Sequence, residues 1–159
     1  MKITLIGAGN VATQLGLALK GAGHHIIQVY SRTQAHADAL ASQLQAQPVS
    51  AWEAITDAAN LYIFALKDSA LCDAITMVCA GKIDKIFVHT AGSVTMDVFK
   101  GHAQHYGVLY PLQTFSKQRR GDFRRIPCFL EASDETTATA LRQLAQTLTP
   151  TIHWMSSSQ

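Results

Sequence analysis

The stretch Gly7-Ala8-Gly9-Asn10-Val11-Ala12 follows the short apolar run Lys2–Ile6 and opens a pattern of apolar residues with helical spacing. Its form, G-x-G-x-x-A between a strand and a helix, is the fingerprint of a dinucleotide-binding turn. In such a turn Gly7 permits the sharp bend, Gly9 lets a pyrophosphate approach the backbone, and Ala12 keeps the helix close to the strand. A glycine turn made only for packing has the same form, so the rest of the chain must decide between the two.

Strand-like apolar runs alternate with helical patterns along the whole chain. The apolar runs predict strands at residues 2–6, 26–30, around 49, 61–66, 85–89, 106–110, 127–132 and 151–155. The helical patterns predict helices that begin near Val11, at the cap Thr33, at Asp68 and after Ser133 or Asp134, with shorter helices after a capping box at 50–53 and over 94–100. This alternation predicts an α/β fold, a Rossmann-type doubly wound, mostly parallel sheet with helices on both faces.

The composition is that of one globular domain. Of the 159 residues 48% are apolar, and the net charge is only +2, which excludes disorder and argues against nucleic acid as the main partner. The longest apolar run falls far short of the ~20 residues that a membrane span needs, so no membrane partner is expected. We therefore predict a single dinucleotide-binding domain over residues 1–155, followed by a polar tail at 156–159.

Cysteine and histidine spacing predicts neither disulfides nor a metal site. Cys72, Cys79 and Cys128 are odd in number and form no C-x-x-C pair, so we interpret them as three reduced core thiols of a cytoplasmic protein. His102 and His105 form an H-x-x-H pair with no third ligand nearby, which favours a polar turn over a metal centre.

The end of the second predicted strand indicates which dinucleotide is bound. An NAD site places Asp or Glu there to hold the ribose hydroxyls, whereas an NADP site places a cation there for the 2′-phosphate. The residues present are Tyr30, Ser31, Arg32 and Thr33, with no carboxylate among them. Because Ser31 and Thr33 can donate hydrogen bonds and Arg32 can pair with a phosphate, the sequence favours NADP as the cofactor.

The carboxyl ends of the later strands carry the candidate substrate-binding residues, because ligands of open parallel sheets lie at that edge. We expect the nicotinamide-side ribose to contact Ala65, Leu66, Lys67 and Asp68. The candidate catalytic and positioning residues are His89, Ser93, Gln113 and Thr114. An imidazole titrates near neutrality and could donate a proton to a substrate oxygen, although a histidine at a strand end is as often a hydrogen-bonded structural residue.

Two segments carry a resemblance to a known family. His89-Thr90-Ala91-Gly92-Ser93 and the segment from Tyr110 to Ser116, with the sequence Y-P-L-Q-T-F-S, resemble a bacterial family of Rossmann-like proteins regarded as NADP oxidoreductases. That family is related to the beta-hydroxyacid dehydrogenase, pyrroline-carboxylate reductase and deazaflavin-dependent NADP reductase group. The resemblance implies a dinucleotide-binding domain followed by a helical domain, which this chain lacks, and a homodimer. It also implies that this chain alone binds the cofactor without turnover.

Three hypotheses for function follow from these patterns. The leading hypothesis is the cofactor-binding domain of an NADP-dependent oxidoreductase that transfers hydride between NADP(H) and a small carbonyl, imine or hydroxy substrate. The alternative is a non-catalytic module that senses NADP(H) or binds a partner. A methyltransferase is disfavoured, because it would also place an acidic residue where Ser31, Arg32 and Thr33 stand.

Overall fold

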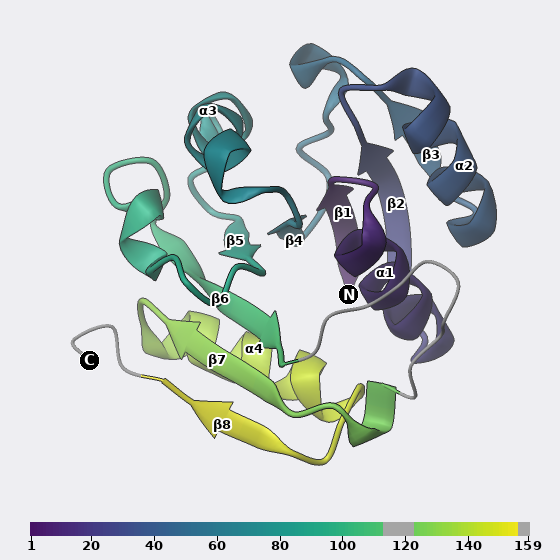
Figure 1. Ribbon diagram of the computed structural model, residues 1–159. Helices are drawn as coiled ribbons and strands as arrows, with labels where there is room; N and C mark the ends of the chain where they lie inside the picture. Colours follow the sequence, from purple (N-terminus) through teal and green to yellow (C-terminus); the bar gives the residue numbers. More distant parts are fainter. Residues whose placement is uncertain (113–122, 156–159) are drawn as a thin grey trace.

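The computed structural model describes residues 1–112 and 123–155, which form a single eight-stranded sheet with helices on both faces (Figure 1). The strands are β1 (Lys2–Ile6), β2 (His25–Tyr30), β3 (Gln47–Val49), β4 (Leu61–Phe64), β5 (Ile86–His89), β6 (His105–Pro111), β7 (Cys128–Ala132) and β8 (Ile152–Trp154). The helices are α1 (Asn10–Gly21), α2 (Gln34–Leu44), α3 (Asp68–Cys79) and α4 (Glu135–Gln146). Single 3₁₀ turns, η1 (Trp52–Ala54), η2 (Met96–Phe99) and η3 (Phe123–Arg125), lie between them.

The strand order confirms the predicted doubly wound fold. In space the strands follow the order β3-β2-β1-β4-β5-β6-β7-β8, and every neighbouring pair is parallel except β6 and β7. The chain proceeds outward from β1 in one direction through β2 and β3, then returns to β4 on the other side of β1. Ligands of such sheets bind at this reversal, outside the carboxyl ends of β1 and β4.

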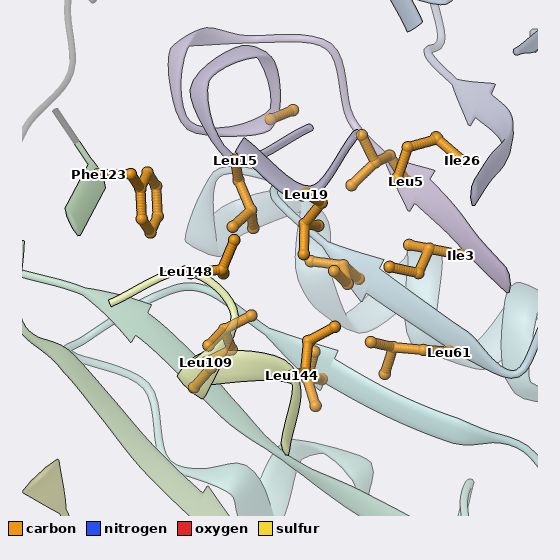
Figure 2. Packing of buried hydrophobic residues seen from close by; sticks show 14 of the residues in the cluster. Ile3, Leu5, Leu15, Leu19, Ile26, Leu61, Leu109, Phe123, Leu144 and Leu148 are labelled. Atoms are coloured by element: carbon orange, nitrogen blue, oxygen red, sulfur yellow. The ribbon is translucent and has the colours of Figure 1, made fainter. Parts of the chain in front are cut away.

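Period-two alternation along β1 separates the core into two parts. Ile3 and Leu5 lie in the cluster covered by α1, α2 and α4, whereas Ile6 lies in the cluster covered by α3. Successive side chains of a strand point to opposite faces, so each of these residues is buried against a different helical layer. Figure 2 shows Leu15 and Leu19 of α1 within the first cluster.

The close packing of α1 on the sheet depends on small residues. Ala12 is completely buried, and a Cβ placed on Gly16 would lie 2.8 Å from Cδ1 of Leu5 and 2.9 Å from Cδ1 of Leu44. These contacts are too short for a larger side chain, so the small residues let β1, α1 and α2 approach one another.

Two local predictions are wrong. The capping box at 50–53 does not form, because Ser50 Oγ instead donates to Gln34 Oε1 (2.7 Å) and only the 3₁₀ turn η1 follows. Extended backbone resumes at Ile55, which is buried, and this leaves no room for an α-helix before β4. The helix predicted over 94–100 is likewise only the turn η2, which Thr95 Oγ1 caps by accepting from Asp97 N.

The cysteines only partly match the predicted core thiols. Cys79 and Cys128 are buried, and burial raises the pKa of the first thiol to about 12 and of the second to about 11. Cys72 is exposed, because it lies on the outward side of α3, opposite Leu71 and Ile75. All three are free thiols.

Among the residues that the structure describes, no helix is long and apolar enough to cross a bilayer.

Asp134 is the cap that starts α4. Its Oδ1 accepts from Thr137 N (2.8 Å), and its Oδ2 lies 2.6 Å from Nδ1 of His105 at the start of β6. Partial burial raises the pKa of this carboxyl, but the hydrogen bonds from Thr137 and His105 outweigh that effect and lower it overall. The aspartate therefore ties the start of α4 to the amino end of β6.

We predict that Asp134→Ala lowers the free energy of unfolding by about 1 kcal/mol at pH 7, whereas Asp134→Asn, which keeps a cap acceptor, costs less. A carboxyl whose pKa is depressed stabilises the fold above its unfolded value, here 3.8, and loses that contribution as the pH falls through the lower folded value. Urea unfolding from pH 7 to pH 2 should therefore show the difference between wild type and Asp134→Ala shrinking below pH 4. A difference that stays constant would contradict the proposed role of the charge.

Candidate functional site

The turn after β1 brings three strand ends together. Gly7 has φ +128°, a conformation that side chains rarely adopt, and its amide donates to the carbonyl of Tyr30 at the end of β2 (2.8 Å). A Cβ on Gly7 would collide with the backbone carbonyl of Ala65, which follows β4. In turn, the Ala65 amide donates to the carbonyl of Ile6 (2.9 Å). Only glycine therefore fits at this position, as the sequence predicted.

The start of α1 offers open backbone amides. Gly9 is the N-cap residue and is exposed, and a Cβ there would meet no atom within 4 Å. The first hydrogen bonds into the helix come from Thr13, whose amide and hydroxyl both donate to the Gly9 carbonyl. The preceding amides of the first turn have no partner inside a helix, and no acidic side chain stands in that turn. The arrangement suits an anion.

The remaining residues of the predicted turn are arranged around these amides. Asn10 is exposed, Ala8 and Val11 are half-buried, and Ala12 is completely buried against the sheet. The buried positions therefore pack the helix onto the sheet, while Gly9 and Asn10 stay exposed at the start of the helix.

The end of β2 leads directly into the N-terminus of α2, which has no side-chain cap. The Ser31 amide donates to the carbonyl of Val49 (3.1 Å), and Ser31 Oγ accepts from the Thr33 amide (3.2 Å). Thr33 occupies the N-cap position of α2 as predicted, but its hydroxyl makes no cap bond, and no acidic residue lies in the first turn. The exposed Arg32 stands beside this helix start. These groups leave donors and a positive charge for a phosphate.

The end of β4 differs in its electrostatics. Lys67 occupies the N-cap position of α3, and Asp68 supplies an acidic side chain to the first turn. The Asp68 carboxylate accepts from the hydroxyl of Ser93 (3.2 Å), which belongs to the loop after β5. A carboxylate at this helix start compensates the helix dipole, so the position favours hydroxyl groups over phosphates. The structure thus joins two residues that lie far apart in the sequence.

His89 lies beneath the loop that follows β5. It is completely buried, its Nδ1 accepts from the Ala91 amide (3.0 Å), and its Nε2 lies 3.2 Å from the Thr95 carbonyl. The ring also stacks on Phe99, with 5.9 Å between ring centroids. Burial lowers the pKa of the imidazole, despite the opposing effects of the Thr95 carbonyl and the Asp68 charge. This geometry favours a neutral histidine whose role is to hold the loop. It disfavours a role in which the histidine donates a proton to a substrate.

The other candidate substrate residues divide between described and undescribed parts of the chain. Ser93 is exposed at the edge of the sheet, and Leu66 is half-buried near Gly7. Gln113 and Thr114 lie outside the described residues, so their role stays a prediction. No group of three metal-ligating side chains occurs within residues 1–112 and 123–155.

Sequence reasoning missed one contact of this edge. A Cβ on Gly92 would lie 2.5 Å from the ring of Tyr110, which shows that the loop after β5 rests on the end of β6. The glycine within the H-T-A-G-S segment was a signal for such a close approach. Tyr110 therefore borders the same edge as Ser93.

The two glycines of the turn should respond differently to substitution. We predict that Gly7→Ala lowers the free energy of unfolding by about 3 kcal/mol or more, because of backbone strain and overlap with the Ala65 carbonyl. Gly9→Ala, where the methyl group meets open space, should cost about 1 kcal/mol or less. Chemical denaturation of both variants checks this, and equal losses would contradict the assigned contacts.

The buried histidine should make stability depend on pH. A histidine whose folded pKa is depressed destabilises the fold once the pH drops below its unfolded value of 6.5, because the unfolded chain then binds the proton more readily. We predict that His89→Asn costs about 2 kcal/mol at pH 7, since the Thr95 carbonyl loses its buried donor, and that it flattens the fall in stability below pH 6.5.

His24 provides the comparison for that measurement. Burial and the charge of the amino terminus lower its pKa as well, so His24→Asn should flatten the same slope independently. Thermal unfolding of both single variants and the double variant between pH 8 and pH 5 separates the two contributions. An unchanged slope in His89→Asn would show that the buried ring takes up no proton on unfolding.

Comparison with known proteins identifies the family of this domain. The model of the Rossmann-like domain matches residues 1–113. The crystal structure of a candidate NADP oxidoreductase from Bacteroides fragilis has a TM-score of 0.95 and 46% identity, and the match covers 99% of this chain and 61% of that one. No curated protein matches the sequence.

More distant solved structures share the fold alone. A pyrroline-5-carboxylate reductase from Coxiella burnetii matches with a TM-score of 0.77 and 17% identity, over 97% of this chain and 58% of that chain. A prephenate dehydrogenase from A. aeolicus, solved with NAD+, matches with a TM-score of 0.82 and 10% identity, over 99% and 60%. This chain thus spans less than two thirds of each of these structures, and it belongs to the Rossmann-like domain family.

Proposed function

We propose that this chain is the NADP(H)-binding domain of an oxidoreductase that transfers hydride between the nicotinamide and a small carbonyl, imine or hydroxy substrate. One observation carries the proposal: the acid-free start of α1, with open space at Gly9, lies at the point where the strand order reverses. The relative from Bacteroides fragilis, which is described as a candidate NADP oxidoreductase and matches nearly the whole chain, supports it.

From the three helix starts along this edge we propose where each part of the cofactor binds. The pyrophosphate would bind the backbone of Gly7–Ala12, and the 2′-phosphate would bind Ser31, Arg32 and Thr33, because neither α1 nor α2 has an acidic residue in its first turn. The nicotinamide-side ribose would bind along residues 65–68, where the Asp68 carboxylate can accept hydrogen bonds from its hydroxyl groups.

The redox chemistry would belong to the cofactor, which donates hydride to a carbonyl or imine or accepts it from a hydroxy substrate. The residues of this chain would orient the nicotinamide and the substrate. Ser93, Gln113 and Thr114 remain our candidates for contacts with the substrate, and Ser93 is positioned by its bond to Asp68. His89 would act as a positioning residue, because both of its nitrogens already hold the loop that carries Ser93.

The further features of the protein are also proposals. We propose that residues 1–155 form one domain. We also propose that a substrate site in this family is completed by a region like the part of the relatives that this chain does not cover. The exposed side chains of Leu112 and Trp154, 49% and 44% accessible, favour coverage by a second copy in a homodimer. Three free thiols, one of them exposed, fit a reducing cytoplasm.

A non-catalytic sensor of NADP(H) is the second candidate. The engagement of both His89 nitrogens within the protein favours it, because the histidine first expected to donate a proton is not available to a substrate. The sensor would bind NADPH with the same residues. Turnover of any carbonyl, imine or hydroxy substrate would exclude it.

We predict that NADPH binds the isolated chain at least ten-fold more tightly than NADH, as measured by calorimetric titration at fixed salt. The folded Gly9→Ala variant should lose most of this binding, because its methyl group occupies the space that the pyrophosphate needs. Unchanged binding in Gly9→Ala would contradict the proposed site.

The preference itself should depend on Arg32. Removing a charged partner of a phosphate costs about 1.5–3 kcal/mol, so Arg32→Ala should weaken NADPH binding about ten- to a hundred-fold and leave NADH binding unchanged. Arg142→Ala is the matched control, because Arg142 lies over the Trp154 ring beside β8, at the opposite edge of the sheet. Equal affinity for the two cofactors in the unmodified chain would defeat the assignment of NADP.

A further inference from the structure

An aromatic pair stands at the carboxyl edge of β2 and β3. The rings of Tyr30 and Trp52 are stacked, with 4.2 Å between centroids and 18° between planes. Tyr30 is only 5% exposed, whereas Trp52 is half-buried and keeps part of its surface accessible. Of the two stacked rings, the indole is therefore the more accessible one.

Backbone hydrogen bonds tie this pair to the proposed phosphate sites. The Tyr30 carbonyl accepts from the Gly7 amide, and the Ser31 amide donates to the carbonyl of Val49, three residues before Trp52. The pKa of Tyr30 is raised, mainly by burial, while the charge of Arg32 lowers it and that of Glu53 raises it. The charges of Arg32 and of Glu53, the residue after Trp52, therefore both act on the Tyr30 phenol.

Apolar side chains continue from the indole toward β4. Trp52 and Leu66 are both partly buried and pack against the cluster that contains Tyr30 and Ile6. Leu66 also borders the phosphate turn, since a Cβ on Gly7 would lie 3.3 Å from its Cδ2. Along the strand order β3-β2-β1-β4, apolar groups therefore flank the strand ends where the adenosine half of a dinucleotide would lie.

We propose that Trp52 is the platform on which the adenine ring of the dinucleotide stacks. The inference rests on the proposed function, because it requires the phosphate positions at Gly9 and Arg32. The base is bonded to the same ribose that carries the 2′-phosphate, so a phosphate held by Arg32 brings the adenine close to this indole. Stacking between a base and an aromatic side chain needs only two flat π-faces, and the supporting tyrosine holds the indole in place.

The chain allows a direct test, because it has only two tryptophans. In Trp154→Phe, Trp52 is the sole tryptophan, and titration with adenosine 2′,5′-bisphosphate should quench its emission with the dissociation constant found by calorimetry. In Trp52→Phe, the emission of Trp154 should stay unchanged, since β8 and β3 lie at opposite edges of the sheet. Nicotinamide mononucleotide, which lacks the adenine, should quench neither.

Affinity provides the second measurement. Trp52→Ala should weaken binding of the bisphosphate about ten-fold, and Trp52→Phe, which keeps a flat ring, should retain most of it. Phe129→Ala, which removes a ring stacked on His153 near β8, is the control and should leave the affinity unchanged. Circular dichroism and thermal unfolding establish that each variant is folded.

The outcomes separate this inference from the proposed function. If calorimetry shows binding of the bisphosphate and NADPH but Trp52 emission does not change and Trp52→Ala binds normally, the platform is wrong and the dinucleotide site stands. If the unmodified chain binds neither compound, the proposed function fails and the platform with it. Quenching of Trp52 together with weaker binding by Trp52→Ala establishes the platform.

Discussion

The close approach of two backbones at Gly7 and Ala65 is the constraint on which the rest of the site depends. No side chain fits between the turn after β1 and the carbonyl that follows β4, so these strand ends can meet only where the first residue is glycine. The Gly7 amide then reaches the carbonyl of Tyr30, which brings the end of β2 to the same place. The reversal of strand order at β1 and β4 turns this meeting point into an edge open to a ligand.

Electrostatics divides this edge into regions suited to different chemical groups. The starts of α1 and α2 have no acidic side chain, so their dipoles and amides are left for an anion, and Arg32 adds a full charge at the second. The start of α3 carries Asp68, which is already bound to Ser93. Phosphates are thus favoured at one end of the edge and hydroxyl groups at the other, as the proposed binding of NADP(H) requires.

The elements of the fold could be predicted because their signals are local. Apolar runs of strand length indicated each strand of residues 1–112 and 123–155, and helical spacing indicated the four α-helices there, since burial of a strand or of one helix face leaves its mark on the sequence. The short turns were harder, and Ser50 bonds Gln34 of α2 rather than the start of η1. Cys72 was misjudged because its residue type suggests burial, although its position on α3 points outward.

The sequence by itself determined the fold class, the glycine turn after β1 and the position of a basic residue directly after β2. Each of these can be recognised from patterns of residues that are close together in the chain. Only the tertiary structure decided what the polar and aromatic residues at the strand ends do. His89 is engaged by its own loop, Ser93 is bound to Asp68, and Trp52 is stacked on Tyr30. Such partners come together through packing between separate loops, and a residue type does not reveal which neighbour will use its hydrogen bonds or its ring.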